Sequence, residues 1–174
     1  MKAQSGFTLV ELMITLAVAI IVMGIGIPSF LKMVSTNQAA GYSNDLVMAI
    51  RLARSEAVKR GSSVAVCASN ADQTACSGSD WNNGWIVFSD DNSDGIVNVG
   101  EEIHRVWSIP TDERADLAFQ GASPNSIRFD PSGGNSADAQ SQVAFKKSDC
   151  HANEARQITI SITGRASLDH VACF

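Results

Sequence analysis

The chain has 174 residues and a formal net charge of −5, which leaves room for one ordinary domain and one extra element but excludes two catalytic domains. The charge is unevenly distributed. Residues 28–61 carry five basic and two acidic side chains, whereas residues 62–174 carry seven basic and fifteen acidic ones. Because an acidic surface repels phosphate backbones, nonspecific nucleic-acid binding would need a locally basic patch.

The first predicted element is a membrane-spanning helix. Residues 7–27 form an apolar run of 21 residues with one charge, Glu11. At about 1.5 Å per residue the run is about 31 Å long, enough to cross a bilayer core of about 30 Å. Residues 1–6 form a short polar leader with Lys2 on the expected cytoplasmic side, and no small-x-small site follows the run, unlike an ordinary secretory signal.

The helical pattern continues beyond Pro28 as an amphipathic half, residues 29–61. Pro28 should kink the helix or melt it locally, because it removes a backbone donor. Lys59 and Arg60 followed by Gly61 predict the end of the helix. The 54 residues from Phe7 to Arg60 would be about 80 Å long, too long for a head of this size to bury.

Residues 62–174 predict a β-rich globular head, because short runs of strand-forming residues alternate there with turn residues such as Asn83-Gly84, Asp94-Gly95 and Ser123-Pro124. The chain is therefore predicted to be α+β. The expected strands are Ser63–Ala68, Trp85–Ser89, Ile103–Trp107, Asp116–Phe119, Ser126–Asp130, Gln142–Lys146, Ile158–Thr163 and a final piece within Arg165–Ala172.

All four cysteines, Cys67, Cys76, Cys150 and Cys173, lie in the head, which would be exported if the apolar run is an anchor. An even number in that location indicates two disulfides. Loop closure favours the local pairs Cys67 with Cys76 and Cys150 with Cys173. Four reduced thiols remain an alternative, and a zinc site is disfavoured because no C-x-x-C spacing occurs.

The segment Gly6-Phe7-Thr8-Leu9-Val10-Glu11 resembles the type IV prepilin signature. The resemblance implies that a membrane prepilin peptidase cleaves after Gly6 and that Phe7 becomes the N-methylated first residue. It also implies that Glu11 registers an incoming subunit on a growing filament. Glu11 has an independent physical interpretation, since a carboxylate in an apolar span needs a positive partner such as a free α-amine. The alternative is a hydrated Glu11 near the membrane interface.

The head resembles minor pilins and pseudopilins of the FimT/FimU and GspH type, through residues 53–57 (Ala-Arg-Ser-Glu-Ala), residues 85–95 and Gly164-Arg165. The resemblance implies the type IV pilin fold and a minor pilin that primes or caps a type IV pilus. The alternatives are a minor pseudopilin of a type II secretion system and a DNA receptor for uptake. Expected partners are other pilins. The expected location is the inner membrane with the head in the periplasm, and then the filament.

Residues Asp90, Asn92, Asp94 and Glu101 match the ligand positions of a calcium-binding EF-hand loop. The flanking segments are strand-like, not helical, and the same residues are common in surface turns. Calcium is thus a possible ligand, with an ordinary turn as the alternative. No other cofactor is expected.

Gly164-Arg165 is similar to a Gly-Arg-x-Lys pattern linked to DNA uptake, although Ser167 stands where the lysine would be. Lys146, Lys147 and Arg165 are the candidate DNA contacts, and a structural role for Arg165 is the alternative. The histidines His104, His151 and His170 are scattered, and none belongs to a catalytic motif, so we expect no enzyme activity.

Overall fold

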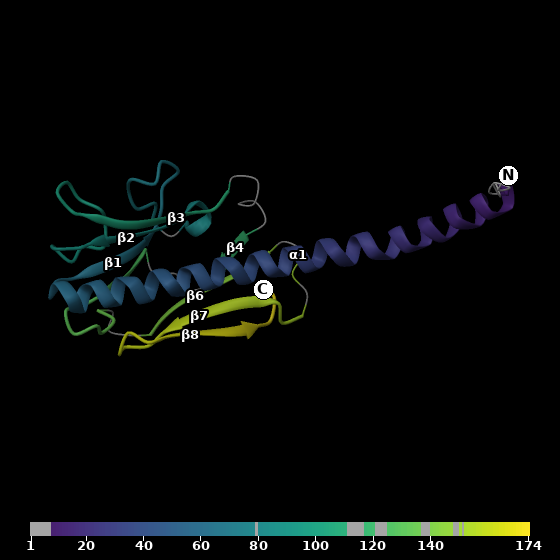
Figure 1. Cartoon of the computed structure of the whole chain (residues 1–174). Helices are drawn as coiled ribbons and strands as arrows, with labels where there is room; N and C mark the ends of the chain where they lie inside the picture. Colours follow the sequence, from purple (N-terminus) through teal and green to yellow (C-terminus); the bar gives the residue numbers. More distant parts are fainter. Residues whose placement is uncertain are drawn as a thin grey trace, which may run out of the picture.

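The structure is a computed structural model that describes residues 8–78, 80–110, 117–120, 125–136, 140–147, 150 and 152–174. It contains one long helix and two antiparallel β-sheets, which confirms the predicted α+β class. Figure 1 shows both sheets along the C-terminal half of the helix, while the N-terminal half projects beyond them. The leader, residues 1–6, and Phe7 lie outside the described residues.

Helix α1 spans Leu9–Arg60, 52 residues. Thr8 caps its start, because the Thr8 hydroxyl accepts a hydrogen bond from the Glu11 backbone N–H at 3.2 Å. Gly61 caps its end in the left-handed conformation, with φ of 67°, and its N–H donates to the Ala57 carbonyl at 2.9 Å. The helix therefore ends where the sequence predicts.

Pro28 lies inside the helix without interrupting it. Figure 1 shows a gentle curve along the projecting half and no break in the ribbon. Of the two predicted effects of Pro28, local melting is therefore wrong, because the helix continues through this residue. A prolyl ring removes a single backbone donor, and the turns on either side keep their own hydrogen bonds.

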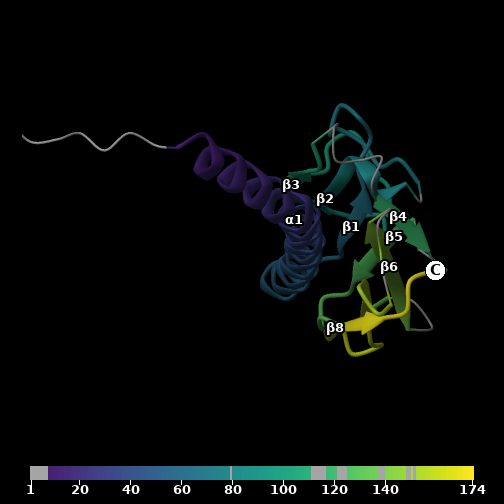
Figure 2. The ribbon, with the colours of Figure 1, turned by 90° about the vertical axis from the view of Figure 1, so that its right-hand side faces the viewer.

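The strands form two four-stranded sheets, which lie on one side of the helix (Figure 2). The first sheet has the order β3-β2-β1-β5, and a short 3-10 turn, η1 (Trp81–Asn83), leads into β2. The second sheet has the order β4-β6-β7-β8. The strands are β1 (Val64–Ala68), β2 (Gly84–Ser89), β3 (Ile103–Ser108), β4 (Leu117–Gln120), β5 (Ser126–Phe129), β6 (Ser141–Lys147), β7 (Ala155–Ile160) and β8 (Ala166–Val171).

The core lies between the helix and the inner faces of the two sheets. The helix buries a stripe at intervals of three and four residues: Ala39, Ser43, Leu46, Ile50, Ala53 and Ala57. Small side chains at four of the six positions allow the helix to approach the strands closely. Strands β1 and β2 are buried on both faces, because Cys76 and Val97 help to cover the outer face of the first sheet.

Most strand predictions are confirmed to within one or two residues. The exception is the predicted strand Ile158–Thr163, since β7 covers Ala155–Ile160 instead. Ile162 and Thr163 belong to the turn between β7 and β8, where the Gly164 N–H donates to the Ser161 carbonyl at 2.8 Å. Asp116 and the Ser123-Pro124 turn lie outside the described residues.

The helix is fastened to the head at a close approach of two loops. Arg54 Nε donates to the Gly133 carbonyl at 2.9 Å. Gly164 lies directly against that carbonyl, because a Cβ at Gly164 would be 2.1 Å from the Gly133 oxygen. Arg54 and Gly164 belong to two of the three segments that carried the resemblance in the sequence, and the structure brings them to one junction.

We expect Gly164→Ala to destabilise the protein more than Gly100→Ala. Both glycines have positive φ, +76° and +98°, so both substitutions introduce backbone strain. Only Gly164 also lacks room, since no atom lies within 4 Å of a Cβ at Gly100. Collision at Gly164 should cost about 1 to 3 kcal/mol more. Chemical denaturation of both full-length variants in detergent measures the difference, and equal losses would contradict the close approach.

Candidate functional site

The projecting half of α1 is the largest apolar surface that the structure describes. Its large hydrophobic side chains are more than half exposed all around the helix, from Leu9 at 74 % to Leu31 at 61 %. Among the described residues, α1 is the one helix long and apolar enough to cross a membrane by length and composition. Its best 18-residue window has a mean hydropathy of 2.5, and none of that window is buried within the chain.

Glu11 is the one charged residue in the first two turns of this surface, and its side chain is exposed. The Glu11 N–H is held by the Thr8 hydroxyl, so residues 8 and 11 form half of a capping box, S/T-x-x-E. This sequence signal for the start of the helix was missed. The proposed cleavage and methylation residues, Gly6 and Phe7, lie outside the described residues, so pairing between Glu11 and a new α-amine stays a prediction.

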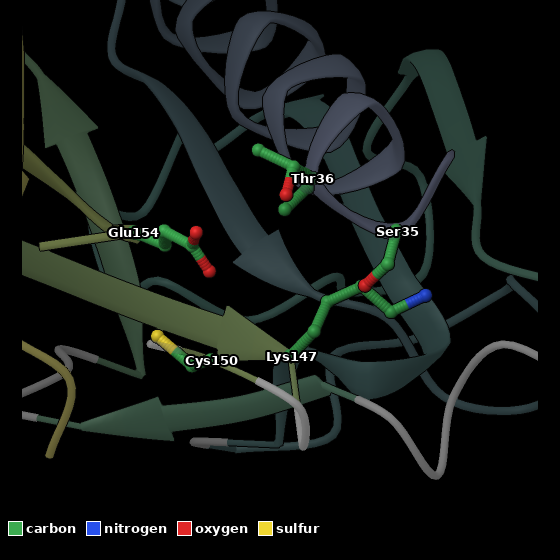
Figure 3. A pocket seen from close by; sticks show the side chains of 6 residues that line it. Ser35, Thr36, Lys147, Cys150 and Glu154 are labelled. Carbon is green, nitrogen blue, oxygen red and sulfur yellow. The ribbon is translucent and has the colours of Figure 1, made fainter. Parts of the chain in front are cut away.

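Polar contacts surround the point at which the helix leaves the head. Lys32 Nζ lies 3.3 Å from Glu154 Oε1, and Lys147 Nζ donates to Gln38 Oε1 at 2.8 Å. Figure 3 shows Lys147, Glu154 and Cys150 beside the helix around a cavity of about 10 Å³, which is the size of one water site. These contacts fix where the projecting half begins.

The structure joins Cys67 to Cys76 and Cys150 to Cys173, with Cα–Cα distances of 5.6 and 6.0 Å. These are the two pairs that loop closure favoured. The first disulfide lies in the apolar cluster on the outer face of the first sheet. The second fastens the C-terminus beside the cavity where the helix leaves the head.

Replacing Cys150 and Cys173 together by serine should lower the free energy of unfolding by about 2 to 5 kcal/mol, because it releases a loop in the unfolded chain. The two cysteines are 23 residues apart. A denaturant titration of the full-length chain in detergent, under non-reducing conditions, gives the change. The exposed Ala172→Ser substitution is the control. A double variant as stable as its parent would mean that this bond contributes nothing.

The acidic loop, residues 90–102, is held together by its own hydrogen bonds. Asp94 accepts from the Ile96 N–H and from the Asn98 amide at 2.9 and 2.8 Å. Glu101 accepts from the backbone N–H groups of Asp91 and Asn98 at 3.1 and 2.7 Å. The hydrogen bond from the Ile96 N–H is the main reason that the pKa of Asp94 is lowered.

The predicted calcium ligands do not converge in this loop. The fully buried Asp90 carboxylate accepts from the Gly95 N–H, while the Asn92 amide donates to Asp94 Oδ2. In the part of the chain that the structure describes, no group of three His, Cys, Asp or Glu side chains is placed to hold a metal ion. The spacing along the chain matched the EF-hand pattern, but the helices that aim its ligands inward are replaced by β2 and β3.

We expect the thermal stability of the full-length chain to be the same in millimolar calcium and in chelator, because the loop carboxylates already accept hydrogen bonds from the loop itself. A ligand that binds only the folded state at a hundredfold excess over its Kd would stabilise it by about 2.7 kcal/mol. An increase in melting temperature that Glu101→Gln abolishes would contradict the expectation and establish the calcium site.

The predicted DNA contacts are separated in the structure. Lys147 is 8 % exposed and bonded to Gln38, and Lys146 lies over the Phe174 ring at 4.9 Å. Both are at the Ala155 end of the sheet, whereas Arg165 is at the opposite end, next to Ala166, which pairs with Ile160. About six residues of strand, or about 20 Å, lie between them. The three residues therefore form no common basic patch.

Comparisons with known proteins agree with this architecture. A model of the prokaryotic N-terminal methylation motif matches residues 1–27. A model of the type II transport protein GspH matches residues 43–164, which is more than half of the chain. The chain belongs to the GspH family. No curated protein sequence matches it.

The GspH-family fold is also present in two crystal structures of the type IV minor pilin FimU from Pseudomonas aeruginosa. In space groups P65 and P21, these are 20 % and 19 % identical to the chain, each with a TM-score of 0.55. They cover 75 % and 76 % of this chain, and the matches cover 91 % and 89 % of the FimU chains. The likeness shows the type IV pilin fold, with one long helix packed on an antiparallel head.

Proteins of the GspH family are structural pilin-type subunits, so the exposed helix surface is interpreted as a packing surface. The candidate site is therefore the exposed half of the helix together with the surfaces around the head. The Arg54 junction and the contacts of Lys32 and Lys147 hold the helix against the head and so position this surface.

Proposed function

We propose that the chain is a minor pilin that primes or caps a type IV pilus. The observation that carries the proposal is the projecting half of α1, which the head leaves exposed from Leu9 to Leu31. Such a surface requires lipid or the apolar helices of other subunits. The methylation motif at residues 1–27 and the fold shared with a minor pilin support the same function.

In this proposal the chain is first inserted in the inner membrane by the projecting half, with its head in the periplasm. Prepilin peptidase removes residues 1–6, and Phe7 becomes the methylated N-terminus. The Glu11 carboxylate then pairs with an N-terminal amine as the helix enters the filament, because an unpaired charge in an apolar bundle is costly. Other pilins are the partners of the helix and of the head.

A minor pseudopilin of a type II secretion system is the second candidate, and the match of residues 43–164 to the GspH model favours it. Deleting the gene distinguishes the two. Loss of surface pili with normal secretion of exported enzymes would support the pilus, whereas the reverse result would support the secretion system. Complementation with the intact gene is the control. Normal pili and normal secretion together would exclude both functions.

Gly6→Val should leave an uncleaved precursor in the inner membrane, because a branched side chain would obstruct the peptidase. An immunoblot of the membrane fraction separates the precursor from the mature form, which is six residues shorter. Normal maturation of this variant would show that cleavage occurs elsewhere.

Glu11→Gln should mature normally but enter filaments poorly, since it removes the charge and keeps the backbone N–H that Thr8 caps. The measure is the ratio of this protein in sheared filaments to that in membranes, expected to fall about tenfold for a lost charge-assisted contact. Thr15→Val, one helical turn away on the exposed surface, is a matched control. Wild-type incorporation of Glu11→Gln would exclude the charge-pairing role.

A further inference from the structure

The last turns of α1 carry an open groove. Five residues line it, Arg51, Arg54, Ser55, Val58 and Lys59, and its volume is about 450 Å³. Val58 is 54 % exposed and provides an aliphatic floor. The groove thus combines an apolar surface with three positive charges.

Part of the positive charge of the groove is uncompensated. Arg54 is anchored by its Nε hydrogen bond to the Gly133 carbonyl, and Lys59 lies 3.4 Å from Glu56. Arg51 is exposed and forms no ion pair with any residue that the structure describes. An acidic partner with an apolar tip would match this surface in both properties.

The acidic loop, residues 90–102, has those properties. Val99 is fully exposed at 108 % and Ile96 is 51 % exposed. The exposed acids Asp91 and Asp94 lie in the same loop, and its internal hydrogen bonds hold its shape before any contact. A preformed loop loses little conformational entropy on binding.

The loop is held away from the groove of its own chain. Arg60 Nη1 donates to Glu102 Oε2 at 2.7 Å and Arg60 Nε to Glu56 Oε2 at 2.9 Å, which fixes the base of the loop on one side of the helix. The His104 ring also forms a hydrogen bond with the Ser89 hydroxyl at 3.1 Å, which holds the start of β3 beside the end of β2. Burial lowers the pKa of His104. The Arg54 side of the groove faces Gly133 instead.

We propose that the groove of one copy receives the acidic loop of a second copy of this chain. Both surfaces lie at the end of the head opposite the projecting helix (Figure 1). Opposite charges and exposed aliphatic groups then meet in one contact. Because the two patches differ, the contact is heterologous.

A charge exchange tests the proposal on the full-length chain in detergent by sedimentation velocity at low salt. Wild type should associate with rising concentration. Arg51→Glu and Asp91→Lys should each weaken self-association about tenfold, since like charges then face each other. An equimolar mixture of the two variants should associate again, because each reversed groove meets a reversed loop. Neither side chain forms an ion pair with a described residue, so both variants should fold, as circular dichroism will verify.

Asp169→Lys is the matched control, an exposed acid on β8 with the same change of charge, and it should associate like wild type. Three results would overturn the proposal: a monomer at every concentration, association that Arg51→Glu leaves unchanged, or a variant mixture that stays dissociated. The second result would assign the association to the apolar helices. Binding of a labelled oligonucleotide that Arg51→Glu abolishes, in a chain that remains monomeric, would assign the groove to nucleic acid and equally overturn the proposal.

Discussion

The length of one apolar helix is the constraint on which the rest of this structure depends. Helix α1 has 52 residues, and its first buried residue is Ala39. The preceding turns expose aliphatic side chains in all directions. Burying one such side chain is worth about 1.5 to 3 kcal/mol, so leaving this whole segment in water would cost tens of kcal/mol. Lipid or the apolar helices of neighbouring chains would remove this segment from water.

The same helix also organises the head. Its second half packs on two sheets that share no strand, so the helix is the element that joins them into one body. Arg54 ties it to the Gly133 loop, Arg60 to the base of the acidic loop, and Gln38 to Lys147 on β6. These contacts occur along its whole packed length.

The sequence predicted the helix, its end, most strands and the favoured cysteine pairs, because each depends on local rules. Apolar periodicity, a glycine after two basic residues and short loops are visible in the chain itself. The direction in which a side chain points depends on the whole fold and is not visible in the same way. Lys146 and Lys147 are adjacent in sequence, but alternation along β6 places Lys147 in a nearly buried position against the helix. The end of β7 was also misplaced, because Ile162 resembles a strand residue and is exposed in a turn.

The arginines of α1 show why residue type alone could not identify the surfaces of this protein. Arg51, Arg54 and Arg60 lie within three turns of one helix and look equivalent in the sequence. The Arg54 guanidinium donates a hydrogen bond to a backbone carbonyl of the head, and the Arg60 guanidinium donates to two carboxylates. Arg51 is exposed, lines the groove and forms no ion pair with the described residues. The helical period of 3.6 residues sends each of them in a different direction. Direction therefore decides which charge stabilises the head and which remains available to a neighbour.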